Sequence, residues 1–159
     1  MSEQTATKRH LPWEDRWHEP QVEQLFPPIQ EQPRRALKGL MSDIEKLGKF
    51  VREVCWYGPA WKWTIEYRVP DQNQVEHVLC YLVPSSAGPL VCVPFSDDVI
   101  AQLPMRRLNK FVRNGIRSAK CAVAVHWATW NLTASTEAGH LTDLVKRKHK
   151  IISGLETKK

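Results

Sequence analysis

The sequence has no long hydrophobic run, and none of its apolar stretches approaches the roughly 18 residues that a transmembrane helix needs. Its first 20 residues mix Lys and Arg with Asp and Glu and lack the apolar stretch of a signal peptide. Together these absences predict a soluble, cytoplasmic protein with no membrane partner.

Cysteine is sparse and never clustered. No two cysteines lie two to four residues apart, as clustered zinc ligands would, and each is isolated in an apolar neighbourhood: Cys55, Cys80, Cys92 and Cys121. Free cysteine behaves as a small buried hydrophobe, so we interpret all four as reduced core residues. A disulfide or a metal site assembled from distant residues is the alternative interpretation.

The sequence also lacks a recognisable local signature of catalysis. We find no nucleophile paired with a base, no paired carboxylates and no phosphate-cradling loop. Adjacent Asp97 and Asp98 diverge on a helix, and Ser96 before them is a good N-cap. These absences favour a non-enzymatic protein with no cofactor and no resident metal, and leave an enzyme of unknown type as the third hypothesis.

What the chain does contain is the apolar content of one domain and an excess of tryptophan. Its 159 residues are 42% hydrophobic and 25% charged, which is typical of a single globular core. Seven tryptophans in such a chain predict either a Trp-rich core or an aromatic-lined pocket, because each indole buries a large area. The formal net charge of +6 admits anionic partners.

Periodicity predicts three helices and four strands. Apolar residues recur at helical spacing over residues 36–47, 105–119 and from Ser135 onward. Residues 61–69 alternate strictly, with Trp61, Trp63, Ile65, Tyr67 and Val69 expected on one buried face. Further strands are predicted at residues 75–83, 90–95 and 122–132. The resulting order α-β-β-β-α-β-α predicts an α+β fold with a mostly antiparallel four-stranded sheet.

These elements predict one folded domain over residues 21–153. Residues 1–20 are expected to form a flexible leader, onto which at least one of Trp13 and Trp17 docks, and residues 154–159 a disordered tail.

The segment from Tyr57 to Val93 resembles a known family. Gly58, the strand that carries Trp61 and Trp63 and ends in Tyr67-Arg68, then Leu79 to Leu82 and Pro84 are similar to a family of small bacterial proteins of unknown function. That family is similar in outline to the YdhG-like α+β domains, with which frataxin-like iron chaperones have been compared. The resemblance covers residues 25–150 and implies a fold but no activity. An iron chaperone would need an acidic face, which the basic charge of this chain does not suit.

Cationic side chains gather on one face of the helix predicted at residues 105–119. Arg106, Lys110, Arg113 and Arg117 lie within about 60° of one another, opposite an apolar face. Such a row can meet successive phosphates, or it is a solvated helix face that only confers solubility. The run from Lys146 to Lys150 is interpreted as a solvated helix end, with Lys148 extending from the apolar side.

A second candidate site is the aromatic group near Gly58-Pro59. A rigid turn there could spread five rings around a small-molecule cavity: Trp56, Tyr57, Trp61, Trp63 and Tyr67. The alternative is that these rings fill the core between sheet and helices.

The sequence therefore leads to a ranking of functions rather than to one function. First is a binding or adaptor domain for a small anionic ligand or a protein partner, which would use the aromatic pocket, the basic helix face or both. Nucleic-acid binding through the basic faces is second. An exposed sheet edge would also allow a homodimer to form.

Overall fold

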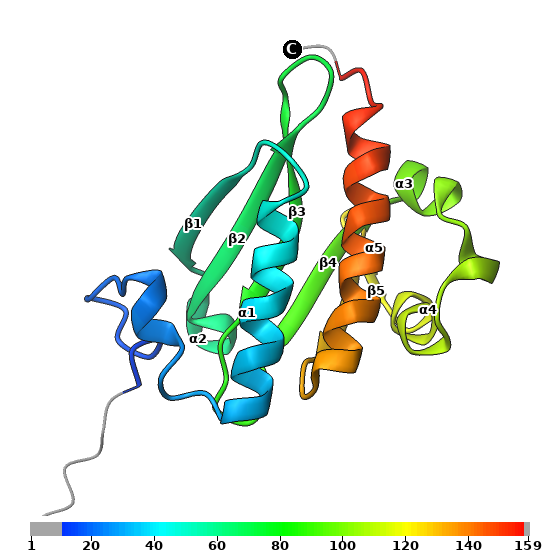
Figure 1. The fold of residues 1–159 in the computed structure, drawn as a ribbon. Helices are drawn as coiled ribbons and strands as arrows, with labels where there is room; N and C mark the ends of the chain where they lie inside the picture. Colours follow the sequence, from blue (N-terminus) through cyan, green and yellow to red (C-terminus); the bar gives the residue numbers. More distant parts are fainter. Residues whose placement is uncertain (1–10, 158–159) are drawn as a thin grey trace, which may run out of the picture.

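The computed structural model describes residues 11–157 and shows one antiparallel sheet with its main helices on one side (Figure 1). The sheet has six strands in the order β1-β2-β3-β4-β6-β5. Along the chain the elements are η1 (Val22–Leu25), α1 (Glu31–Glu45), β1 (Val51–Trp56), α2 (Gly58–Trp61), β2 (Trp63–Pro70), β3 (Glu76–Val83), β4 (Leu90–Ser96), α3 (Asp97–Gln102), η2 (Met105–Arg107), α4 (Lys110–Arg117), β5 (Lys120–Ala122), β6 (Val125–Asn131) and α5 (Ser135–Ser153).

The core lies between this sheet and the pair α1 and α5, which run side by side across it (Figure 1). On β2 every second side chain points toward the helices, and Trp63, Ile65, Tyr67 and Val69 are all buried, as their alternation predicts. The helices α3 and α4 lie beside α5, and α4 packs on β6, where the Trp130 indole donates to the Phe111 carbonyl. None of the described helices is both long and apolar enough to cross a membrane.

The predicted α+β class and antiparallel sheet are confirmed, but the prediction of four strands and three helices in the order α-β-β-β-α-β-α is wrong. The structure has an additional edge strand, β1, in which the polar Arg52 and Glu53 interrupt the apolar pattern. The strand predicted at residues 122–132 is instead a hairpin, in which Ala122 ends β5 and Val125 begins β6. Val123 and Ala124 form the hairpin turn with positive φ angles, although neither residue type signals a turn.

Two predicted elements have different bounds in the structure. The helix expected at residues 105–119 is a 3₁₀ turn, an extended Leu108 and then α4, because the Asn109 side chain accepts from the Phe111 amide and caps a new helix start. Trp61 belongs to the short helix α2 and not to the strand, because Lys62 adopts a positive φ of 57° and redirects the chain before β2.

The described ends of the chain contact the domain. Trp13 is 4% exposed and sits in the core, whereas Trp17 is 82% exposed, so one of the two tryptophans docks as expected. At the other end, the Thr157 amide donates to Asp71. Residues 1–10 of the predicted leader and residues 158–159 of the predicted tail lie outside the described part.

Candidate ligand-binding site on the open sheet face

The sheet face turned away from α1 and α5 carries a continuous row of aromatic rings. Tyr57 and Trp61 come from the turn and helix before β2, Tyr81 from β3 and Trp127 from β6. The Tyr81 ring is the centre of the row, with centroids 5.4 Å from Tyr57, 5.3 Å from Trp61 and 6.1 Å from Trp127. Tyr81 pairs with Glu66 of β2, and paired residues of an antiparallel ladder point to the same face of the sheet. Since Ile65 and Tyr67 point toward the helices, Glu66 and Tyr81 lie on the opposite face.

The five aromatic residues selected from the sequence divide between the two faces. Trp56, Trp63 and Tyr67 lie on the helix side, where the Trp63 indole donates to the Asp15 carbonyl and the Tyr67 hydroxyl to Glu45. Only Tyr57 and Trp61 belong to the aromatic row. Its other members, Tyr81 and Trp127, were not selected, because only strand register brings residues so far apart in sequence together.

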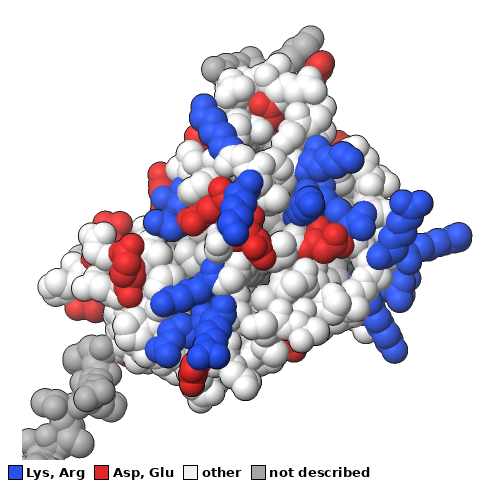
Figure 2. Space-filling view, viewed as in Figure 1, with Lys and Arg blue, Asp and Glu red and all other residues white. Residues whose placement is uncertain are grey.

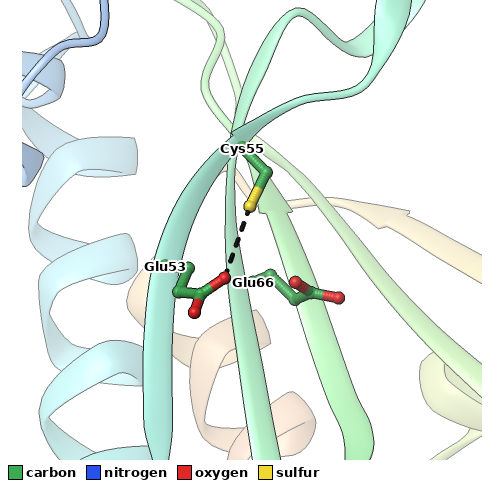
Figure 3. Close-up of side chains that lie close together, drawn as sticks. All are labelled: Glu53, Cys55 and Glu66. Carbon is green, nitrogen blue, oxygen red and sulfur yellow. Dashed lines mark hydrogen bonds between the residues drawn. The ribbon is translucent and has the colours of Figure 1, made fainter.

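Beside the row lies a charged cluster on β1 and β2, formed by Glu53, Cys55, Glu66 and Arg68. Figure 3 shows Glu53 and Cys55 on one strand facing Glu66 on the next, and the Cys55 thiol donates to Glu53 at 3.8 Å. Arg68 reaches Glu53 at 2.6 Å and Glu66 at 3.7 Å. Burial, followed by the charges of Glu66 and Glu53, raises the pKa of the Cys55 thiol. Arg68 holds both carboxylates in ion pairs, so we interpret this cluster as an ion-pair network. It keeps a net negative charge, because one arginine balances only one of the two carboxylates.

The aromatic row leads to a cavity where the sheet opens between β3 and β4. These strands pair only from Tyr81 to Val83, opposite Leu90 to Cys92. Beyond that point Pro94 on β4 has no amide to donate, and the strands are no longer paired. A cavity of about 520 Å³ lies there, with walls that include Tyr81, Trp127, Phe95 and Val78.

Lys148 of α5 fills the gap between the two strands from the helix side. Its ammonium donates to the carbonyls of Val78 at 2.8 Å and Leu79 at 3.0 Å on β3, and to the Pro94 carbonyl on β4. The side chain thus supplies donors that the interrupted ladder lacks. It also lies over the Phe95 ring, 5.3 Å from the ring centroid.

Lys148 is a buried cation without an acidic partner within the described residues. The residue is 3% exposed and forms none of the ion pairs between described side chains. Burial lowers the pKa of Lys148 to about 7. Two neighbouring thiols do not offset its charge, since burial raises the pKa of both Cys80 and Cys92 to about 12 and keeps them protonated. The interpretation of residues 146–150 as a solvated helix end is therefore wrong for Lys148.

A second buried polar group, Asp71, holds residues at the rim of the cavity in position. Asp71 accepts from the His77 ring at 2.9 Å and from the amides of Asn73, Val75 and Thr157. Burial alone would raise the pKa of Asp71, but these hydrogen bonds outweigh it and hold the pKa below its usual range. The bonds position His77 and the segment up to Thr157, both of which line the cavity.

The basic face expected on the helix at residues 105–119 lies away from this cavity. Arg106 is in η2, and Lys110, Arg113 and Arg117 follow on α4, opposite the buried Val112 and Ile116. Figure 2 shows Lys and Arg side chains projecting from the edge of the molecule where α4 lies in Figure 1. The structure therefore presents two separate candidate sites, one aromatic and one basic.

In comparisons with known proteins, the chain matches no family model, no curated protein and no solved structure at the significance that would indicate a relative. The likeness to YdhG-like domains therefore stays a prediction, and the functional argument depends on the geometry of this chain alone.

Proposed function

We propose that the protein is a non-enzymatic binding module that takes a small, flat, anionic molecule into the cavity between β3 and β4. The observation that carries the proposal is the Lys148 ammonium, a buried positive charge beside an aromatic-lined opening of the sheet. We use the name sheet cavity for the space lined by Val78, Tyr81, Phe95, Trp127 and Lys148.

The walls of the sheet cavity support a flat ligand. Its volume of about 520 Å³ is within the range of small-molecule sites, roughly 300 to 1,000 Å³. Tyr81 and Trp127 are inclined by only 30° to each other, so a planar ring that stacks on one is close to parallel with the other. Aromatic contacts of this kind contribute about 0.5 to 1.5 kcal/mol beyond the area they bury.

Lys148 has a pKa of about 7, so below that pH it is mostly charged, and this charge favours an anionic ligand. All three ammonium protons are already donated to carbonyls, so the attraction acts through space and not through a direct hydrogen bond. In a site shielded from water such an attraction is several times stronger than in solution. Asp98 and Glu156 at the rim are exposed, so water and salt screen their opposing charge.

The same contacts favour binding over catalysis. Lys148 is committed to three carbonyls, and His77 to Asp71. The Cys80 and Cys92 thiols stay protonated at neutral pH and are weak nucleophiles. Lys148, His77 and the two thiols are therefore poorly suited to transfer a proton or to attack a substrate.

The test uses 2-naphthoate, a flat carboxylate, and its uncharged amide 2-naphthamide as a matched pair. At pH 6, where Lys148 is mostly protonated, naphthoate is expected to raise the melting temperature progressively with concentration and to bind at least about fivefold more tightly than the amide. Equal affinities would contradict the anionic part of the proposal. Absence of any shift with naphthoate and with a panel of planar sulfonates would contradict the proposal as a whole.

Two tryptophan variants localise the binding. Trp127→Ala removes a wall of the sheet cavity and is expected to weaken naphthoate at least about tenfold. Trp17→Ala removes an exposed indole on the N-terminal segment and is the matched control, with unchanged affinity expected. Equal losses in the two variants would place the binding outside the sheet cavity.

A further inference from the structure

The helix α4 and the turn before it form a surface of cations that the described carboxylates do not neutralise. We call this surface the α4 basic face and define it as Arg106, Arg107, Lys110, Arg113 and Arg117. Four of the five residues are exposed, and Arg113 is half-buried. None of them forms an ion pair with a described acidic side chain, whereas Arg35, Arg52, Arg68 and Arg147 each do.

The sequence explains why this surface has no counter-charges. No Asp or Glu occurs between Asp98 and Glu137, although six Lys and Arg residues lie in that stretch: Arg106, Arg107, Lys110, Arg113, Arg117 and Lys120. A helix face that only confers solubility usually mixes both signs, as α1 does with the pair Glu31 and Arg35. At the edge of the fold where α4 lies, Lys and Arg side chains therefore project without Asp or Glu among them, whereas elsewhere on this face both signs occur (Figure 2).

From these observations we infer that the α4 basic face binds the phosphate backbone of nucleic acid. Lys110, Arg113 and Arg117 lie on one side of α4, about 4.5 and 6 Å apart along the helix axis. A duplex strand advances about 3.4 Å per nucleotide, so each of these residues can reach a phosphate one or two nucleotides from the last. Arginine meets a phosphate with two parallel hydrogen bonds, which suits it to this contact.

A groove lies between α5 and the segment that precedes the α4 basic face. Gln102 and Pro104 form one side of a groove of about 370 Å³, and Arg147 and Lys150 form the other. Lys150 is exposed and forms no ion pair with a described side chain. A strand bound along α4 that extends toward α5 can therefore meet the cation of Lys150, whereas Arg147 is paired with Asp143.

An anionic membrane suits this face less well than nucleic acid does. A helix that binds a lipid surface inserts an apolar face into the headgroup region. The apolar side of α4 is not free to do so, since Val112 and Ile116 are buried against the domain.

The α4 basic face consists of cations and contains no aromatic side chain that could stack on a base. Binding through this face is therefore to the phosphate backbone, without base readout.

The experiment measures fluorescence anisotropy of a labelled 20-base-pair DNA duplex and its RNA counterpart at several KCl concentrations. With about four phosphate contacts, the logarithm of affinity should fall with the logarithm of salt concentration with a slope near −4. The double variant Arg113→Glu and Arg117→Glu should lose at least about 30-fold in affinity and show a slope shallower by about two units. No measurable binding of wild type at 50 mM KCl would overturn the inference.

A charge-matched control separates a defined surface from net charge. Lys46→Glu and Lys49→Glu change the net charge by the same amount at exposed positions near the end of α1 and should lose less than about threefold. Equal losses in the two double variants would overturn the inference. So would binding to phosphatidylserine vesicles that depends on Arg113 and Arg117 in the absence of nucleic-acid binding. Melting curves show whether both double variants are folded. The double variant Arg106→Gln and Lys110→Gln removes two cations without adding negative charge, and it should also weaken duplex binding.

This inference is independent of the sheet cavity. Trp127→Ala should leave duplex binding unchanged, and the Arg113 and Arg117 variant should leave naphthoate binding unchanged.

Discussion

The ammonium of Lys148 donates to the backbone carbonyl of Val78 at 2.8 Å, in the region where β3 and β4 are no longer paired. A helix side chain thus takes part in the hydrogen bonding of a sheet. Because the same ammonium also bonds Leu79 and Pro94, it links the two halves of the sheet, β1-β2-β3 and β4-β6-β5, behind the cavity. The feature that we propose for ligand attraction is therefore also a structural link.

The first prediction concerns that link. Lys148→Met keeps the length of the side chain but leaves three buried carbonyls without a donor, each at a cost of about 1 to 3 kcal/mol. Removing the buried charge offsets part of this cost. We expect a net loss of about 3 kcal/mol in the free energy of unfolding, measured by urea denaturation. Lys146→Met, two residues earlier on the exposed side of α5, should change it by less than about 0.5 kcal/mol.

The second prediction concerns pH. The pKa of Lys148 falls from 10.5 in the unfolded chain to about 7 in the fold because the charge is buried. Between these values the unfolded chain binds more protons, so Lys148 adds to the free energy of unfolding a contribution that rises with pH, by at most about 1.4 kcal/mol per unit. Above pH 9 the raised pKa values of the Cys80 and Cys92 thiols act in the opposite direction, which leaves pH 7 to 9 as the clear window.

The measurement for this prediction is the difference in unfolding free energy between wild type and Lys148→Met at pH 7, 8 and 9. The difference should grow with pH, and a constant difference would contradict the lowered pKa. Competitive acetylation of wild type followed by mass spectrometry provides a second measurement, which does not require the variant to fold.

The sequence predicted the elements whose apolar residues follow a regular spacing. The alternation from Trp63 to Val69 is clear because α1 and α5 cover one face of β2. The edge strand β1 was not predicted, because its polar Arg52 and Glu53 interrupt the apolar pattern. The three residues of β5 are too few for any periodicity.

The candidate site was harder to predict than the fold, for two reasons. The aromatic row joins Tyr57, Tyr81 and Trp127 through strand register, which periodicity within single segments does not contain. Lys148 does stand in the apolar stripe of α5, three residues after Val145 and four before Ile152. Its basic neighbours suggested a solvated run, and only the gap between β3 and β4 explains why a lysine occupies a core position.

The third prediction tests the contact between α4 and the sheet. A Cβ atom on Gly115 would lie 2.1 Å from the Trp130 indole nitrogen, which donates to the Phe111 carbonyl at 3.1 Å. Gly115→Ala is therefore expected to destabilise the fold by about 1 to 3 kcal/mol despite alanine's higher helix propensity. Gly39→Ala on α1 is the control, because nothing lies within 4 Å of the added methyl group. It should stabilise the protein by up to about 1 kcal/mol, and similar effects of the two substitutions in thermal melts would contradict the close contact.

The last prediction concerns the hairpin between β5 and β6. Val123 and Ala124 have φ angles of 52° and 61°, and the Val123 side chain is 97% exposed, so it gains no packing energy from this conformation. A left-handed conformation strains a β-branched residue, whereas Asn followed by Gly adopts it readily in a two-residue turn. Val123→Asn with Ala124→Gly should raise the free energy of unfolding by about 1 kcal/mol or more, measured by denaturant titration. The reverse order, Val123→Gly with Ala124→Asn, should give a smaller gain, since Asn-Gly is the preferred order in such a turn. A loss of stability in both variants would show that the hairpin does not have this turn conformation in solution.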